Sequence, residues 1–358
     1  MLNPILYFKR NPKNLILIMI ISSLAVLVIS LAVAIISSIR LSMETVVVNQ
    51  FTDYSAVIYK GTDEDAESIL NDTLSNVDLH TVSIDYANFD TAFGTNSVFL
   101  YAFYDTDTMQ TVFDYSNMIL TNGRMPQIGC SEIILHESIL KNRGLSIGDK
   151  LGNKEIVGTM NGSKIVGYSF YSDEEKEQAG YLAPCFIIVS EEIESVRAAL
   201  DEFDKEKWQT FTYTALNKQL EEEMSTLNLI MLMIVFMIVS CLSIAVAALI
   251  FTIYSGRYEE FAILNAMGYK KRKIRLLVIS EIVILSLSSW FLGYSLSLVG
   301  MSIVNETIYK DLGQQMPLFN ENGFFYSILL PFLSILCAVL PVSRKLSKTD
   351  LIGIIERR

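Results

Sequence analysis

The chain has 358 residues, of which 51% are hydrophobic and 19% charged, and its mean hydropathy is +0.38. This composition is too apolar for an ordinary soluble protein and directs attention to membrane-spanning segments. The formal net charge of −11 argues against nucleic acid as a partner.

Four runs of the sequence are free of charged residues and long enough to cross a bilayer: 15–39, 224–256, 282–305 and 322–343. The first run has 25 residues. As a helix it would extend roughly 37 Å, whereas the hydrocarbon core is about 30 Å thick. It also exceeds the apolar region of a signal peptide, so we expect it to be retained as a membrane helix.

Basic residues are concentrated on one side of these runs. They lie before the first run, between the second and third, and after the fourth: Lys9, Arg10, Lys13, Arg257, Lys270, Lys271, Arg272, Lys273, Arg275, Arg344, Lys345, Lys348, Arg357 and Arg358. The positive-inside rule places these segments in the cytoplasm. We therefore predict a multi-pass protein of the cell membrane, with both termini cytoplasmic and a large outer segment.

The predicted division of the chain follows from these spans. It comprises a cytoplasmic N-terminus (1–14), a first membrane helix with the start of a stalk (15–40), an extracytoplasmic domain (41–223), a second membrane helix (224–256), a cytoplasmic segment (257–275), a third membrane helix (276–305), an outer loop (306–321), a fourth membrane helix (322–343) and a cytoplasmic tail (344–358).

The outer segment 41–223 holds 12 Lys+Arg and 31 Asp+Glu, a formal charge of −19. Its acidity either keeps an exposed domain soluble or attracts cationic peptides and counter-ions. Strand and helix patterns alternate in it, which is typical of an α+β domain. Strands are predicted at 55–59, 82–86, 98–104, 185–189 and 209–214, and helices at 66–77 and 193–203.

Between these strand and helix units, residues 105–181 are predicted to form an inserted, glycine-punctuated subdomain rich in short strands. Residues 215–227 are polar, favour helix and contain no breaker, so the second membrane helix should continue outward as a stalk. Cys130 and Cys185 both lie in this outer segment, where a disulfide is chemically allowed but is not established by spacing.

The signatures of several enzyme classes are absent from the sequence. It has no GxxxxGK[ST] phosphate loop, and the nearest string, Gly158 to Lys164, has Ser163 where the second motif glycine belongs. It has no HExxH, CxxC or GxSxG motif. His136 beside Glu137 is read as an exposed polar turn rather than an acid–base pair. We expect a non-catalytic chain that holds no metal and does not itself bind ATP.

The most informative stretch is GRYEEFAILNAMGYKKRKIRLLVISE, residues 256–281, between the second and third spans. A helix beginning near Tyr258 would align Phe261, Leu264 and Met267 on one face, and Gly268 would let the chain turn. That apolar stripe is suited to the groove of a partner protein. Its alternative is an interfacial helix lying on lipid, with its lysines on anionic head groups.

This stretch resembles the signature region of FtsX-like permeases of ABC transporters, in which a short helix ending in Ala-x-Gly precedes a basic stretch and the third membrane helix. Residues 121–151 and 343–358 resemble two further runs of that family. The order of one span, a large outer domain and three spans is similar to the MacB-type subgroup. The resemblance implies four transmembrane α-helices with an inserted α+β extracytoplasmic domain like the MacB-type periplasmic core domain.

The resemblance also implies partners and a mechanism. A separate ABC ATPase subunit would bind ATP and magnesium, a second permease copy or homologue would complete a dimer in the lipid membrane, and mechanotransmission would move the outer domain to export or displace peptide, antibiotic or lipid-linked substrates. The residues expected to couple to the ATPase are Glu259, Glu260, Phe261, Leu264, Met267 and Gly268.

Two other functions remain open at this stage. One is a non-transporting regulator, as in division-type FtsX, whose outer domain activates a cell-wall hydrolase. The other is a membrane-anchored sensor that needs no ATPase. Within the third span, Glu281 is expected to reach the head-group layer beside Arg275, while Gly293 and Gly300 share one helix face and are expected to permit close helix packing.

Overall fold

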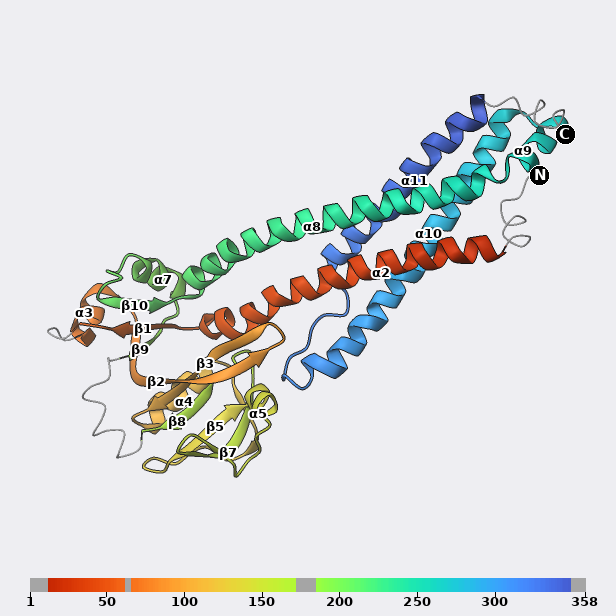
Figure 1. The fold of residues 1–358 in the computed structure, drawn as a ribbon. Helices are drawn as coiled ribbons and strands as arrows, with labels where there is room; N and C mark the ends of the chain where they lie inside the picture. The colour runs from red at the N-terminus through yellow and green to blue at the C-terminus, as the bar shows by residue number, and fades with distance from the viewer. Residues whose placement is uncertain (1–11, 62–65, 172–184, 349–358) are drawn as a thin grey trace. The chain divides into compact units, whose positions relative to one another are not determined.

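The computed structural model describes residues 12–61, 66–171 and 185–348 (Figure 1). It consists of two compact units. The helical unit takes in the described parts of 1–37, 227–304 and 317–358, and the sheet unit takes in those of 38–226 together with 305–316. Predicted features in 1–11, 62–65, 172–184 and 349–358 lie outside the described residues.

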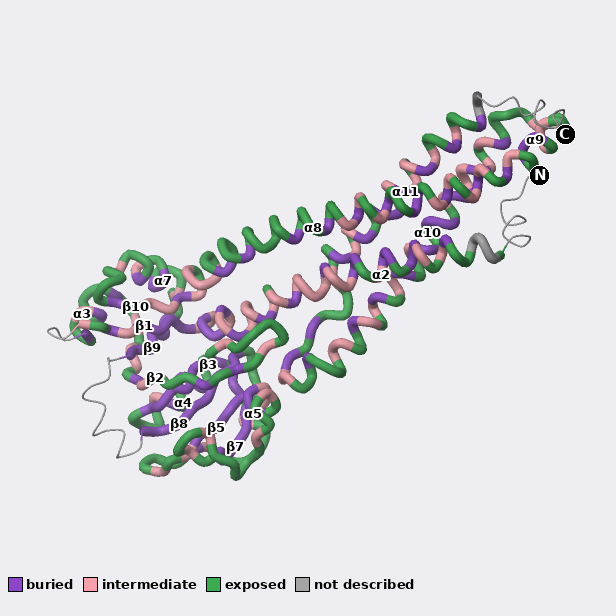
Figure 2. The backbone as a smooth tube through the Cα atoms, viewed as in Figure 1, coloured by how far each residue is buried: buried purple, intermediate pink, exposed green. Residues whose placement is uncertain are grey.

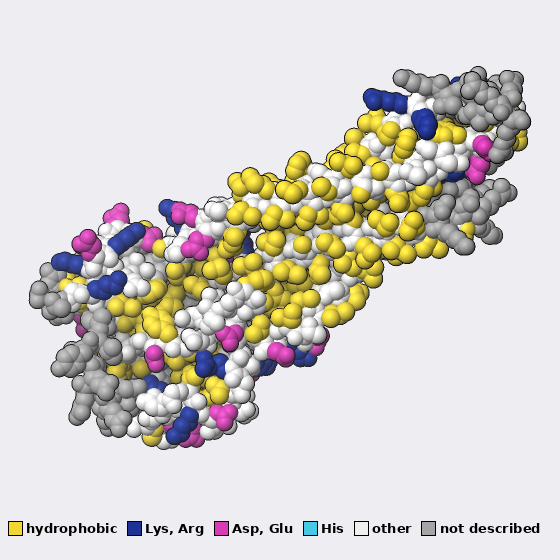
Figure 3. All heavy atoms as spheres, in the orientation of Figure 1, with side chains coloured by type: hydrophobic (Ala, Val, Ile, Leu, Met, Phe, Trp, Pro, Cys, Tyr) yellow, Lys and Arg dark blue, Asp and Glu magenta, His cyan; other side chains and the backbone are white. Residues whose placement is uncertain are grey.

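Within the described residues, four helices are long and apolar enough to cross a membrane: α2 (Pro12–Met43), α8 (Tyr213–Ser255), α10 (Lys271–Val304) and α11 (Glu321–Lys348). They contain the four charge-free runs of the sequence. Side chains exposed along them are mainly apolar, as the space-filling view shows over the long helices (Figure 3). Such a surface matches a hydrocarbon environment and is unusual on a protein surrounded by water.

The predicted helical extension of the second span over residues 215–227 is confirmed, because α8 runs without interruption from Tyr213 to Ser255. The first span also continues beyond its apolar run. Helix α2 ends at Met43 and is followed by a π-helical turn, η1 (Glu44–Val48), and a 3₁₀ turn, η2 (Asn49–Phe51). Both extensions contain good helix formers and no Gly or Pro.

Helices α2 and α10 approach closely at Gly293. A β-carbon there would lie 2.4 Å from the backbone oxygen of Ser23, so only glycine fits. The Ser23 hydroxyl donates to the carbonyl of Ser289 at 2.9 Å across the same contact. At Gly300 an added β-carbon would meet only Leu31, at an ordinary 3.6 Å. The prediction of close packing is therefore confirmed at Gly293, whereas Gly300 is not needed for it.

The sheet unit is built on one mixed sheet. In the described residues its strands are β1 (Ser55–Tyr59), β2 (Asp78–Thr91), β3 (Gly94–Phe103), β4 (Ile119–Gly123), β5 (Glu132–His136), β6 (Lys150–Leu151), β7 (Lys154–Asn161), β8 (Gly167–Phe170), β9 (Cys185–Val189) and β10 (Trp208–Phe211). The spatial order is β10-β1-β9-β2-β3-β8-β5-β7-β4, with β6 beside β7. The β3–β8 and β5–β7 pairs are parallel and the other pairs are antiparallel.

Helices cover both faces of the sheet: α3 (Ala66–Thr73), α4 (Thr106–Tyr115), α5 (Glu137–Arg143) and α7 (Ile193–Asp201). Strand β3 shows the arrangement. Tyr101 and Phe103 join the core cluster that includes α4, whereas Val98 and Leu100 join the cluster that includes α5. Successive side chains of a strand point to opposite faces. Burial of both faces accounts for the continuous apolar run of β3, and Figure 2 shows the buried central strands.

Each predicted strand and helix of the outer segment has a counterpart, with β2 and β3 longer than expected. Helix α3 ends at Thr73 rather than 77, and β10 ends at Phe211 because α8 already begins at Tyr213, inside the strand predicted at 209–214. The segment predicted as a subdomain, 105–181, contributes β4 to β8 to the same sheet as β1, through the β3–β8 pair, rather than forming a sheet of its own. Cys130 and Cys185 are not bonded to each other, and Cys185 is buried within β9.

His136 corrects an expectation from the sequence, because it is buried rather than part of an exposed turn. It caps the N-terminus of α5, where its Nδ1 accepts a hydrogen bond from the backbone N–H of Ser138 at 3.1 Å. Its Nε2 lies 3.3 Å from the carbonyl of Gly162. Burial lowers the pKa of His136 below its ordinary value.

The short connection between α10 and α11 packs within the sheet unit. Its first turn, η4 (Asn305–Tyr309), is followed by Gly313, whose φ of +67° is left-handed and whose added β-carbon would lie 2.5 Å from the carbonyl oxygen of Ser138. The Asn142 amide donates to the carbonyls of both Leu312, at 2.9 Å, and Asp90, at 2.6 Å. Asn142 thus ties this connection to α5 and β2.

A buried ion pair lies near the start of the sheet unit. The Lys164 side chain is fully buried, and its Nζ lies 2.8 Å from an Asp53 carboxylate oxygen and 4.1 Å from the ring centre of Tyr54. Burial lowers the pKa of Lys164 from 10.5 to about 8, an effect that Asp53 partly offsets. Between these two pH values the unfolded chain holds a proton that the folded chain releases.

Stability should consequently rise with pH in that window. Relative to a Lys164→Met variant, the wild-type chain should gain about 1 kcal/mol of unfolding free energy per pH unit from pH 8 towards 10.5. Unfolding curves of the two full-length proteins across this range would measure the difference. Lys141→Met, at an exposed site of α5, is the control and should leave the slope unchanged. Parallel curves for wild type and Lys164→Met would contradict the assignment.

Candidate functional site

The segment between α8 and α10 forms a short helix, α9 (Tyr258–Ala266), within the helical unit. Its C-terminus is closed by Gly268, which has a left-handed φ of +91°. The N–H of Gly268 donates to the carbonyl of Asn265, and that of Tyr269 to the carbonyl of Leu264. These two bonds make a Schellman motif, which ends a helix where glycine permits the reversal. The turn predicted at Gly268 is therefore present.

The predicted stripe of α9 is divided by the fold. Phe261 is fully buried and joins a core cluster with Ile274 and Val278 of α10. Leu264 is half-buried in the same cluster, whereas Met267 is 62% exposed. The inward face includes Phe261 because α10 folds back beneath α9 and offers it an apolar surface. Phe261 is thus an anchor of the helix rather than part of a free surface.

The large apolar side chains exposed on α9 and its C-cap are Ile263, at 53% exposure, and Met267. These residues are four positions apart and lie on the same side of the helix. Ile263 was not among the residues predicted from the sequence. Once Phe261 is assigned to the core, the exposed apolar face of the helix shifts by two positions, from Phe261 to Ile263. We call Ile263 and Met267 the α9 apolar pair.

The two acidic residues predicted for this site, Glu259 and Glu260, are both exposed on the first turn of α9. A carboxylate there is favoured by the positive end of the helix dipole. Glu260 also accepts a hydrogen bond from Nε of Arg257 at 3.1 Å. Of the predicted residues, Phe261 is buried and Leu264 is half-buried. The others are exposed: Glu259, Glu260, Met267 and Gly268.

A buried ion pair links the start of α9 to α10. Arg257, at the N-terminus of α9, donates through Nη1 to Glu281 of α10 at 2.6 Å, and their side chains are only 9% and 1% exposed. The rings of Tyr254 and Phe261 each lie 5.0 Å from the guanidinium carbon. An arginine held by a carboxylate and two aromatic faces has few alternative positions.

This pair corrects the expectation that Glu281 reaches the head-group layer beside Arg275. Glu281 faces the interior of the helical unit, and its partner is Arg257, a residue that the sequence identified only as part of the basic flank. Both are the first charged residues met on leaving their apolar runs, 224–256 and 282–305. Their matching positions at the ends of two consecutive apolar runs could have predicted the pair, because opposite charges at such positions can neutralise each other.

Among the residues that the structure describes, no group of three or more His, Cys, Asp and Glu side chains is placed to hold a metal ion. Around α9, a short helix packs on α10 through Phe261 and Leu264 and leaves acidic and apolar side chains exposed.

Residues 230–351 match the FtsX-like permease C-terminal family, a range that covers α9, α10, α11 and most of α8. No curated protein matches the chain. One similar solved structure is the periplasmic region of MacB from Actinobacillus actinomycetemcomitans, with 11% identity, covering 48% of this chain and 94% of that chain at a TM-score of 0.30. Another is the extracellular domain of the noncanonic ABC-type transporter YknZ from Gram-positive bacteria, with 12% identity, covering 44% of this chain and 99% of that chain at a TM-score of 0.27.

Proposed function

We propose that this chain, whose residues 230–351 belong to the FtsX-like permease family, is the membrane subunit of an ABC transporter driven by a separate ATPase chain. The basic flanks of the spans support a cytoplasmic position for α9 and both termini, with the sheet unit on the outer side. In this arrangement ATP and magnesium bind to the ATPase. The permease contributes the surface on which that ATPase acts.

The observation that carries the proposal is the division of α9 into an anchored and an exposed face. The α9 apolar pair is available to a groove on the ATPase, and Glu259 and Glu260 border it with negative charge. An isolated interfacial helix would need basic residues along its polar face to hold anionic lipid, whereas the charged residues within α9 itself are both acidic. Docking to a protein therefore explains α9 better than docking to lipid.

Force applied to α9 has a direct route to the helices that flank it. Phe261 packs in the core of the helical unit, and Arg257 is bonded to Glu281 of α10. On the other side, α8 continues as one helix to Tyr213, two residues beyond the last residue of β10. A displacement of α9 is thereby passed to α10 and along α8 to the chain segment that enters the sheet.

The complete transporter would contain two permease copies, or this chain and a homologue, within the lipid membrane. ATP-driven movement of the ATPases would be converted into movement of the sheet units. Export or displacement of a peptide, antibiotic or lipid-linked molecule fits such a machine, because the work is done outside the membrane and requires no catalytic group on this chain.

The test is to place charge on the α9 apolar pair. An Ile263→Asp/Met267→Asp variant should lose at least about tenfold of the permease-dependent ATPase rate, because burying two carboxylates in an apolar groove is strongly unfavourable. Its thermal unfolding should stay close to that of wild type, since both positions are exposed. The measurement is ATP turnover by the ATPase reconstituted with each permease in lipid vesicles.

The matched control places the same charges on exposed apolar residues of the sheet unit, in an Ile119→Asp/Ile128→Asp variant. That variant should keep the wild-type turnover rate. If the Ile263→Asp/Met267→Asp protein stimulated the ATPase fully, α9 would not be the docking surface, and the proposed coupling would be wrong.

A further inference from the structure

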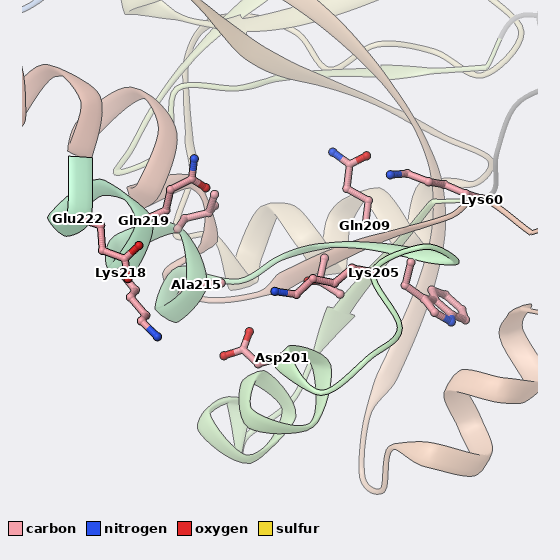
Figure 4. Close-up of a pocket in the computed structure, with 11 residues that line it drawn as sticks. Lys60, Asp201, Lys205, Gln209, Ala215, Lys218, Gln219 and Glu222 are labelled. Atoms are coloured by element: carbon pink, nitrogen blue, oxygen red, sulfur yellow. The ribbon is translucent and has the colours of Figure 1, made fainter. Parts of the chain in front are cut away.

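The sheet unit contains a pocket of about 540 Å³ where β10 meets the first turns of α8 (Figure 4). This volume lies within the range of about 300 to 1,000 Å³ that is typical of ligand sites. Three lysines line the pocket from separate segments: Lys60 follows β1, Lys205 precedes β10, and Lys218 lies on α8. The pocket is remote in sequence from α9 and takes no part in the proposed docking of an ATPase.

One wall of the pocket is the open edge of the sheet. Strand β10 is the last strand of the described sheet and pairs with β1. Three consecutive residues of β10, Trp208, Gln209 and Thr210, all line the pocket. Because successive side chains of a strand alternate between its two faces, a pocket that meets all three must run along the strand edge.

The register shows which backbone groups are free at this edge. The N–H of Lys60 donates to the carbonyl of Lys207 at 2.8 Å, which makes these residues a hydrogen-bonded pair. Bonded and non-bonded pairs alternate along an antiparallel ladder. Trp208 and Thr210 therefore belong to non-bonded pairs, and their N–H and C=O groups point away from β1. The N–H of Trp208 already donates to the carbonyl of Asp204 at 2.8 Å, so the free N–H and C=O at this edge are those of Thr210. An incoming strand can pair with them.

The charge of the pocket is opposite to that of its surroundings. Lys60, Lys205 and Lys218 form no ion pair with another described residue, in an outer segment whose formal charge is −19. Two acids also line the pocket, Asp201 and Glu222. Asp201 already accepts a hydrogen bond from the Thr212 hydroxyl at 3.2 Å. The lysines thus leave an excess of positive charge beside the strand edge.

We propose that this pocket binds an extended acidic peptide segment, which adds a strand to β10 at Thr210 and places carboxylates beside Lys60, Lys205 and Lys218. Strand addition supplies affinity through backbone hydrogen bonds, and the lysines select acidic side chains. A free anion or a lipid head group could satisfy the lysines, but neither carries the peptide N–H and C=O groups that would pair with Thr210.

The experiment uses the detergent-purified full-length chain and a fluorescent peptide of alternating glutamate and valine, followed by fluorescence polarisation without nucleotide. A Lys205→Gln/Lys218→Gln variant should bind this peptide about tenfold more weakly. Lys141→Gln/Lys150→Gln, which changes the charge equally at exposed sites of α5 and β6, should bind as wild type does. Raising the salt concentration should weaken binding to wild type more than to the Lys205→Gln/Lys218→Gln variant.

Two further probes separate a strand from a simple anion. A peptide with N-methylated backbone amides, which cannot pair with β10, should bind at least about tenfold more weakly than the unmodified peptide. A peptide with lysine in place of glutamate should not bind. Equal binding of the N-methylated peptide, or full displacement by millimolar phosphate or by anionic lipid micelles, would overturn the proposal and leave an anion site only. Equal weakening in both lysine variants would also overturn it.

Discussion

Replacing Glu281 by Leu should destabilise the helical unit by about 3 to 5 kcal/mol, because Arg257 would keep its charge in a buried place without its principal partner. Arg257→Met should have a similar effect, since it leaves the carboxylate of Glu281 buried and unpaired. The double variant Arg257→Met/Glu281→Leu should recover most of the lost stability. Two apolar side chains of similar length can occupy the site without a buried charge.

Thermal or denaturant unfolding of the four proteins in one detergent would give this double-mutant cycle. Glu260→Gln is the control, because it removes the other carboxylate on Arg257 but lies 53% exposed. It should cost no more than about 1 kcal/mol. If Glu260→Gln and Glu281→Leu were equally damaging, or if the double variant were as unstable as the sum of the single ones, the pair would not be the support of α9.

Replacing Gly293 by Val should separate α2 from α10 and lower the unfolding free energy by several kcal/mol. An added β-carbon would stand 2.4 Å from a backbone oxygen of Ser23 and 2.8 Å from the Val26 β-carbon, and neither neighbour is the end of a flexible side chain. Relief requires a shift of the whole helix, which breaks the hydrogen bond between Ser23 and Ser289. Close approach at small residues is a principal source of helix association in membranes.

Gly300→Val provides the matched comparison, being the same substitution seven residues further along α10. It faces only the side chain of Leu31 at 3.6 Å and should change stability by less than about 1 kcal/mol. The unfolding midpoints of the two variants in detergent would report their stability. Similar losses for the two valine variants would show that Gly293 has no special place in the packing.

The large features of the fold were predictable from composition. Four charge-free runs of sufficient length give four helices, because a bilayer leaves few other structures for such a segment. Strand β1 and strand β9 were placed at their observed residues, since short β-branched and apolar runs flanked by polar residues admit little else. The uninterrupted start of α8 followed from the absence of any helix breaker.

What the sequence did not reveal depends on long-range contacts. Spacing placed Phe261 and Met267 on one stripe, but only the return of α10 beneath α9 decides that one is buried and the other exposed. The same applies to Glu281. Whether its ion-pair partner is Arg257 or Arg275 depends on which side of α10 faces the interior of the helical unit. The burial of His136 likewise depends on a distant part of the chain, because its Nε2 lies against the carbonyl of Gly162.

The sheet topology was beyond prediction for a similar reason. The parallel pair of β3 and β8 joins residues more than sixty positions apart, and no local pattern in the sequence encodes such a partner. Without that pair, the segment 105–181 looks like an independent insertion. With it, both halves share one hydrophobic core.

The docking of the connection between α10 and α11 has a consequence for movement. Because Gly313 packs on Ser138 and the Asn142 amide donates to the carbonyl of Leu312, the connection 305–316 belongs to the sheet unit, although the helices on either side of it belong to the helical unit. The chain therefore passes between the two units at four points, after residues 37, 226, 304 and 316. Any motion that separates this connection from α5 must first break the hydrogen bond between Asn142 and Leu312.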